Sequence, residues 1–150
     1  RGFGRTGYPA ISMSYQAAEA FCSWLSTRTD RTYTIPTIEQ WELANVADGG
    51  AWHQWNSAKT THPVATTEPN SLGMYDMRGN VGEWVNTNNG PRVIGGSFRT
   101  PEEELGSASI LEAEKSWNLT DPQLPRSPWW FADADYVGLR LVTTDGEHDE

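Results

Sequence analysis

Two carboxylates in one glycine-rich stretch, Asp76 and Glu83, are the residues of this sequence best suited to chemistry. Three glycines within residues 69–84 mark a backbone that turns or approaches another segment closely, so we expect a compact, ordered loop. Such a loop leaves the carbonyl oxygens of Gly79 and Val81 outside any helix or sheet. Carboxylate and carbonyl oxygens are the ligands that Ca²⁺ takes, six to eight at a time. The stretch therefore predicts a calcium site.

The same loop also has an interpretation without metal. Asp76 and Asn80 can close turns by accepting backbone N–H groups, and Glu83 can be a solvated or backbone-capping carboxylate. Both interpretations stay open at this stage, since residue types and spacing alone do not separate them.

Other residue types that support catalysis or metal binding are scattered. His53 and His62 have no recognised metal-ligand spacing and are expected to be surface polar groups. Cys22 is the single cysteine, so an internal disulfide is excluded, and its sequence neighbours include no base that would stabilise a thiolate. The sequence has no Ser-His-Asp order, phosphate-binding loop or zinc spacing. No catalytic set is predicted.

Two helices are expected to position these segments. Ser14 can cap a helix over residues 15–28, whose three- and four-residue apolar spacing predicts a buried stripe of Ala18, Phe21, Cys22 and Leu25. In the second helix Thr37 and Gln40 form a capping box, and the helix ends near Asn45.

Short strands are expected at residues 32–35, 92–98 and 136–143, the last of which closes the domain. The middle strand contains two adjacent glycines, which indicate a bulge or a close backbone approach. Residues 105–120 are polar, with Trp117 isolated among them.

Composition bounds the class of protein. A chain of 150 residues with 37% hydrophobic residues and eight tryptophans predicts one globular domain over residues 1–144, followed by an acidic tail over residues 145–150. A net charge of -9 disfavours nucleic acid and anionic membrane surfaces as partners. No apolar run approaches the roughly 20 residues that a membrane span needs.

Four segments, in order along the chain, resemble the formylglycine-generating-enzyme (sulfatase-modifying factor) family. Residues 69–84 resemble its N-x-x-G-L-Y-D-M-x-G-N-V-W-E-W signature, and residues 33–42 its Y-R-L-P-T-E-A-E-W-E. Residues 92–98 resemble R-V-x-R-G-G-S-W, and residues 137–142 resemble the closing V-G-F-R-L-V. The resemblance implies an α+β, C-type-lectin-like fold with little regular structure, short twisted antiparallel strands, two helices and long calcium-pinned loops.

The resemblance also implies metal ligands. It assigns one Ca²⁺ to the side chain of Asp76, the carbonyls of Gly79 and Val81, and the carboxylate of Glu83. Asn56 and Ser57 resemble the opening of another calcium site, whose following acidic and aromatic ligands are absent here. One calcium is therefore expected, and the second site is doubtful.

Catalysis by the family's founding enzymes uses copper held by two cysteine thiolates shortly after the G-G-S strand. Cu(I) is a soft ion that requires soft ligands, and the segment after Ser97 contains no cysteine. A related branch uses iron held by histidines of a separate helical domain, which this sequence lacks. We therefore expect no copper and no formylglycine-generating activity.

The sequence is thus expected to encode a non-catalytic, calcium-stabilised binding or accessory-subunit domain that meets a protein partner or larger assembly outside the cytoplasm. The aromatic candidates for partner binding are Trp52, Trp55, Trp129, Trp130 and Phe131. One alternative is a maturation enzyme, formylglycine-generating-like or another metal-dependent oxidase, with a pocket around Ser97, Arg99 and Arg140. Another alternative, from fold analogy, is a sugar-binding lectin-like module.

The resemblance covers only part of the family domain. The family's first strand, G-G-x-F-x-M-G-S, and its E-V-T-N-x-x-Y/F helix have no counterpart here. We expect either that this first part lies outside the present sequence or that another chain completes the core.

Overall fold

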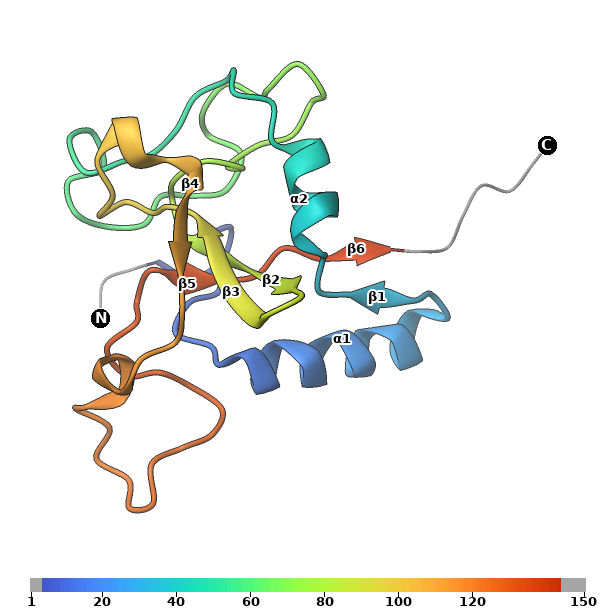
Figure 1. Ribbon diagram of the computed structural model, residues 1–150, viewed down its shortest axis with the longest axis vertical. Helices are drawn as coiled ribbons and strands as arrows, with labels where there is room; N and C mark the ends of the chain where they lie inside the picture. Colours follow the sequence, from blue (N-terminus) through green and yellow to red (C-terminus); the bar gives the residue numbers. More distant parts are fainter. Residues whose placement is uncertain (1–3, 144–150) are drawn as a thin grey trace.

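The computed structural model describes residues 4–143 (Figure 1). Its helices are α1 (Tyr15–Thr29) and α2 (Ile38–Ala44), with short 3-10 helices η1 (Glu102–Glu104) and η2 (Lys115–Asn118). Its strands are β1 (Tyr33–Thr34), β2 (Gly82–Thr87), β3 (Gly90–Gly95), β4 (Gly106–Leu111), β5 (Val137–Gly138) and β6 (Val142–Thr143). No helix among these residues is long and apolar enough to cross a membrane.

The strands form two small sheets. The larger has the order β4-β3-β2-β5, in which β2 pairs antiparallel with β3 and parallel with β5. The smaller pairs β1 with β6 antiparallel, and α1 runs alongside β1 (Figure 1). Long loops over residues 45–81 gather on the side of the larger sheet away from α1 (Figure 1). This mixed architecture with little regular structure confirms the predicted α+β class.

Helix α1 begins as expected but buries a narrower stripe. The Ser14 hydroxyl caps it by accepting the N–H of the third helical residue at 3.1 Å. Ala18 and Cys22 are buried, and these small side chains let the helix backbone approach the core closely. Phe21 is 45% exposed and stacks on Trp24 at the surface, with ring centroids 5.6 Å apart. The expected burial of Phe21 is therefore wrong.

Helix α2 confirms the capping box. The Thr37 N–H donates to Gln40 Oε1 at 2.9 Å, and the Gln40 N–H donates to Thr37 Oγ1 at 3.2 Å. The helix ends at Ala44, and the N–H of Asn45 satisfies the carbonyl of Trp41 at 3.1 Å. This short helix fixes the direction of the buried Trp41 side chain.

Two clusters of buried side chains form the core. The larger contains Trp84 and Trp117, whose ring centroids lie 6.2 Å apart. The smaller contains Trp41, Met77, Val85 and Ile94. Trp117, which stands alone among polar residues in the sequence, is thus a core residue, and its carbonyl accepts the N–H of Asp133 at 2.9 Å.

Strand boundaries differ from expectation at several places. The predicted strand over residues 136–143 is divided into β5 and β6, which belong to different sheets. The predicted strand over residues 92–98 ends at Gly95, where the pairing with β4 shifts register. A side chain at Gly95 would lie 3.0 Å from the carbonyl oxygen of Met77, which explains why this kinked position suits glycine.

The bounds of β1, β2 and β4 also differ from expectation. The expected strand over residues 32–35 is reduced to β1, and the last residues of the expected loop 69–84 belong to β2. Strand β4 lies within residues 105–120, where no strand was predicted because the small polar residues lack the alternation that indicates one. The predicted tail over residues 145–150 lies outside the described residues.

The capping box predicts a stability difference. Thr37→Ala removes the hydroxyl that satisfies the N–H of Gln40, so we expect the free energy of unfolding to fall by about 1 kcal/mol. Urea denaturation followed by tryptophan fluorescence measures it. Glu42→Ala, on the exposed face of the same helix, is the matched control and should change stability by less than about 0.5 kcal/mol. Equal effects would mean that the cap contributes nothing.

Candidate functional site

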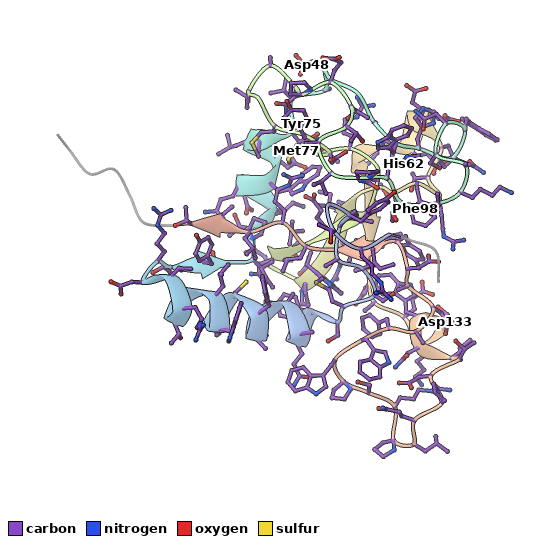
Figure 2. All side chains as sticks on the ribbon, turned by 180° about the vertical axis from the view of Figure 1, so that it is seen from behind. Asp48, His62, Tyr75, Met77, Phe98 and Asp133 are labelled. Carbon is purple, nitrogen blue, oxygen red and sulfur yellow. The ribbon has the colours of Figure 1, made fainter. Side chains whose placement is uncertain are left out.

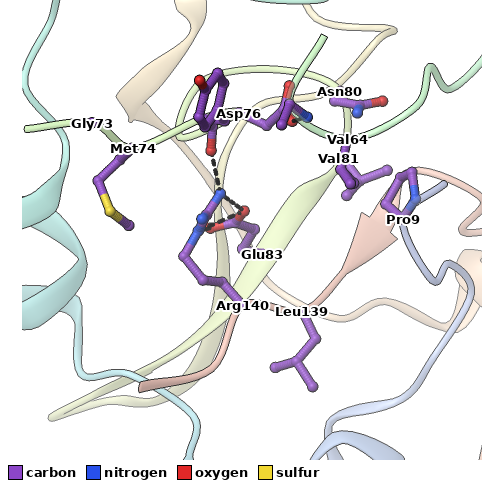
Figure 3. Close-up of a pocket in the computed structure, with 12 residues that line it drawn as sticks. Pro9, Val64, Gly73, Met74, Asp76, Asn80, Val81, Glu83, Leu139 and Arg140 are labelled. Carbon is purple, nitrogen blue, oxygen red and sulfur yellow. Dashed lines mark hydrogen bonds and ion pairs between the residues drawn. The ribbon is translucent and has the colours of Figure 1, made fainter. Parts of the chain in front are cut away.

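Glu83 is a buried carboxylate held from both sides. It lies in β2 with 5% of its surface exposed. Its Oε2 accepts the indole N–H of Trp41 at 2.7 Å. Arg140 Nε donates to both carboxylate oxygens, at 3.1 and 3.0 Å, and Arg140 Nη2 donates to Oε1 at 2.8 Å (Figure 3). The guanidinium therefore supplies the counter-charge that makes burial of this carboxylate tolerable.

The protonation of this pair follows from its burial. Removal from water raises the pKa of Glu83, while the charge and hydrogen bonds of Arg140 and the Trp41 N–H act in the opposite direction. For Arg140, burial is the largest single effect and lowers the pKa, but the charge and hydrogen bonds of Glu83 together with the charge of Asp76 raise it overall. The pKa of Glu83 is raised overall, because its side chain is the more deeply buried of the two, with 6% exposure against 25% for Arg140. The three guanidinium N–H contacts require an ionised carboxylate, so the pair is ionic.

Asp76 is the second carboxylate of the site, and one of its oxygens lacks a partner. Its backbone is left-handed, with φ of 54°, and only 9% of the residue is exposed. Oδ2 accepts the N–H of Ala65 at 2.8 Å, whereas no described residue donates a hydrogen bond to the buried Oδ1. A buried anionic oxygen without a donor is costly, and a cation would satisfy it. The side chain of Asp76 therefore fits the predicted calcium ligand.

The backbone between the two carboxylates is fixed by contacts with distant segments. Gly79 has φ of 78° and donates its N–H to the carbonyl of Gly95 at 3.1 Å. The N–H of Asn80 donates to the carbonyl of Trp52 at 2.8 Å, and the Asn80 side chain pairs with both backbone groups of His62, at 3.1 and 3.0 Å. Asn80 thus crosslinks two loops instead of closing its own turn. The carbonyls of Gly79 and Val81 lie on this pinned backbone.

A pocket of about 370 Å³ opens beside these residues (Figure 3). Its charged lining consists of Asp76, Glu83 and Arg140, and its apolar lining includes Pro9, Val64, Met74, Val81 and Leu139. Among the described residues, no group of three or more His, Cys, Asp or Glu side chains could hold a metal. A calcium ion here would therefore depend on backbone oxygens as well as carboxylates.

The residues predicted for an enzyme pocket do not meet around this cavity. Arg140 lines it, but Ser97 and Arg99 lie in the turn after β3. The Ser97 hydroxyl accepts the N–H of Arg99 at 3.2 Å, and the Arg99 guanidinium pairs with Asp135 at 2.6 Å. Both side chains have structural contacts of their own.

The residues of the doubtful second calcium site stabilise their own loop. Asn56 accepts the N–H of His53 at 2.8 Å and donates to the carbonyl of Ala51 at 2.9 Å. The hydroxyl of Ser57 is buried and donates to the carbonyl of Phe98 at 2.9 Å. The side-chain oxygens of both residues therefore have hydrogen-bond partners within the protein.

Neither histidine is the surface group that its isolation suggested. His53 is buried, accepts the N–H of Trp55 at 3.3 Å, and places its Nε2 3.6 Å from a carboxylate oxygen of Glu102. The rings of His62, labelled in Figure 2, and Trp52 stack with centroids 3.6 Å apart, and His62 Nε2 lies 2.8 Å from the carbonyl oxygen of Ser57. Aromatic stacking between loop residues leaves no periodic signal, so the sequence could not reveal it.

The five aromatic candidates for partner binding separate into two groups. Trp55, Trp129 and Trp130 are 72%, 48% and 42% exposed. Trp52 is held by its stack on histidine and by an N–H contact to Thr66 at 3.2 Å, and Phe131 packs against the core. Only the first group is available at the surface.

The loop before Trp129 projects from the body of the domain (Figure 1). Asp121 holds it by accepting the N–H groups of Gln123 at 3.0 Å and Ser127 at 2.8 Å, and these hydrogen bonds lower the pKa of the Asp121 carboxyl. Trp129 and Trp130 are thereby presented on an ordered support.

Comparison with protein families matches residues 49–144 to the sulfatase-modifying factor enzyme 1-like domain. The chain belongs to this family. The formylglycine-generating enzyme of Streptomyces coelicolor is 28% identical over 108 residues, covering 54% of the chain and 32% of that protein. Serine/threonine-protein kinase pkn1 of Chlamydia pneumoniae is 29% identical over 119 residues, covering 70% of the chain and 18% of that protein. The match thus spans less than a third of either curated relative.

Solved structures share the fold of this family member. PvdO from Pseudomonas aeruginosa gives a TM-score of 0.66 at 20% identity, covering 93% of this chain and 69% of that one. Treponema denticola variable protein 1 gives a TM-score of 0.71 at 18% identity, covering 93% of this chain and 72% of that one. These likenesses confirm the predicted fold, and they carry no assignment of activity.

The buried ion pair predicts strong energetic coupling. Glu83→Gln and Arg140→Gln each leave one buried charge without its partner, so each should lower the free energy of unfolding by about 3 kcal/mol. The double variant should lose clearly less than the sum of the two. Glu112 forms a surface ion pair with Arg92, in which Oε2 and Nη2 lie 3.4 Å apart. Glu112→Gln is therefore the control and should lower the free energy of unfolding by less than about 1 kcal/mol. Additive losses in urea denaturation would contradict the pairing.

Proposed function

We propose that this member of the sulfatase-modifying-factor family is a non-catalytic, calcium-stabilised domain that binds a protein partner or serves as an accessory subunit outside the cytoplasm. The observation that carries the proposal is the position of the single thiol. Cys22 is buried in the packed core under α1, and burial raises the pKa of its thiol, which disfavours the thiolate that nucleophilic or redox chemistry requires.

The segment in which copper-binding family members carry their cysteine pair supports the same conclusion. Here it contains the acidic helix η1 and the serine- and alanine-containing start of β4. Carboxylates and hydroxyls are hard ligands that suit a Cu(I) centre poorly. Formylglycine generation by copper-thiolate chemistry therefore has no ligands in this chain.

The unpartnered oxygen of Asp76 supports the calcium part of the proposal. Asp76 and the carbonyls of Gly79 and Val81 would hold the ion, with Glu83 as the fourth ligand. Calcium would supply the missing counter-charge to Asp76 and stabilise the loop that leads into β2. Because Glu83 already has Arg140 as a charge partner, the affinity is expected to rest more on Asp76.

Exposed tryptophans support the binding role. Trp55, Trp129 and Trp130 offer large, rigid apolar surfaces of the kind that dominate protein interfaces. Trp129 and Trp130 are held by an ordered loop, so little conformational entropy is lost when a partner covers them.

Calcium binding is tested by a thermal melt. We expect chelator-washed protein to gain about 2.7 kcal/mol of stability when free Ca²⁺ reaches a hundredfold excess over its Kd. Asp76→Asn should abolish the gain, since it removes the anionic oxygen that the ion needs. Asp48→Asn, at an exposed turn carboxylate, is the matched control and should retain it. A wild-type melt that is indifferent to calcium and chelator would refute this part of the proposal.

The absence of thiol chemistry is tested separately. Cys22 should resist iodoacetamide in the folded protein and react readily in urea, because the thiol is buried and its pKa is raised. Intact-mass spectrometry measures both states. In the same preparation, loaded with Cu(I) and given oxygen, a cysteine-containing sulfatase peptide should gain no aldehyde. Rapid labelling of the native thiol or a formylglycine product would overturn the non-catalytic assignment.

A further inference from the structure

The pocket beside Asp76 is larger than a structural metal ion requires, and its wall contains both charged and apolar side chains. Its volume of about 370 Å³ lies within the range of small-molecule sites. Asp76, Val81 and Glu83, all expected calcium ligands, contribute to its wall (Figure 3). An ion held by these residues would therefore border the pocket.

Arg140 brings unused hydrogen-bond donors to this wall. Its Nε and Nη2 donate to Glu83, and Nη2 also donates to the carbonyl of Tyr75 at 2.7 Å. None of the described residues accepts a hydrogen bond from Nη1. A guanidinium has a fixed planar fork, so the remaining N–H groups point in defined directions and suit an anionic oxygen.

The charge of the pocket depends on calcium. Two carboxylates and one guanidinium are its charged groups, so without metal it carries one net negative charge. A bound Ca²⁺ would reverse this to one net positive charge. Calcium prefers six to eight oxygens, and the four expected protein ligands leave coordination positions for water or for ligand oxygens. An anion would be repelled before calcium binds and attracted afterwards.

Apolar side chains define the other half of a suitable ligand. Val64, Met74 and Leu139 lie on the wall with Pro9 (Figure 3). A compact aliphatic group would bury apolar surface against them, while one charged group would meet the calcium and Arg140. A fully polar anion such as phosphate would leave this part of the wall unused.

We infer that, once calcium is bound, this pocket takes a carboxylate that carries a small aliphatic group. The inference rests on the calcium site proposed above. The same chemistry is presented by a free short-chain acid and by the terminal carboxylate of a polypeptide ending in an aliphatic residue.

The test is calorimetric titration of 3-methylbutanoate into the wild-type protein, with saturating Ca²⁺ and, separately, with chelator. We expect binding with calcium and at least tenfold weaker binding without it, since the two sites are linked through charge. The neutral isostere 3-methylbutanamide should bind at least tenfold more weakly than the acid. An acetylated tripeptide ending in leucine, compared with its C-terminal amide, distinguishes a polypeptide terminus from a free acid as the source.

Variants on the exposed part of the wall provide the control. Val64→Glu places a negative charge at the pocket and should abolish acid binding. Leu72→Glu adds the same charge at an exposed residue of the same loop region that does not line the pocket, and should leave acid binding within about twofold.

The outcomes separate the two proposals because calcium is also titrated alone. Calcium binding without acid binding, or equal binding of acid and amide, overturns the carboxylate inference and leaves the calcium site standing. Acid binding that is unchanged by chelator overturns the inference as well. No heat and no melting shift with calcium alone refutes the calcium site, and the calcium-dependent inference with it.

Discussion

The charge balance of one buried carboxylate holds the parts of this domain together. Glu83 receives the indole N–H of Trp41 from α2 and the guanidinium of Arg140 from the segment between β5 and β6. The same guanidinium donates to the carbonyl of Tyr75 and so attaches the loop before β2. Elements from three parts of the chain therefore meet at one side chain. A buried charge tolerates no loss of these partners, which makes the junction specific as well as stable.

The remainder of the structure repeats this use of polar contacts between long-range neighbours. Trp84 is buried in β2 and still satisfies its indole N–H with the carbonyl of Met13 at 3.1 Å. Asn80 joins the loop before β2 to the backbone of His62. In a chain with few long helices or strands, such contacts take over the role of continuous backbone pairing, because buried polar groups must each find a partner.

Features determined by neighbouring residues could be predicted from the sequence. The Ser14 cap and the Thr37–Gln40 capping box depend on contacts within one helical turn, and both are present. The glycine-rich character of residues 69–84 likewise predicted an irregular loop. The family motifs predicted the fold, since four of them occur in order between residues 33 and 142 and not in one segment only.

Features determined by distant contacts could not be predicted. The partner of Glu83 lies 57 residues away, so the carboxylate could be read only as a metal ligand or a cap. Phe21 has the apolar spacing of a core residue, but the close approach of the helix at Ala18 and Cys22 leaves it outside. A distant contact also explains why Ser97 and Arg99 do not line the pocket with Arg140. The Arg99 side chain forms an ion pair with Asp135.

The two carboxylates of the site differ in how their oxygens are satisfied. Glu83 accepts N–H groups from Trp41 and Arg140, which oppose the rise that burial causes in the pKa of its carboxyl. Asp76 retains one unpaired oxygen, yet no described His, Cys or Lys lies with it on the pocket wall to share a proton or act as nucleophile. An unpaired anionic oxygen beside an ion pair can attract a cation, which would satisfy its charge. Recognition through charge is therefore the chemistry that the arrangement of these two carboxylates supports most directly.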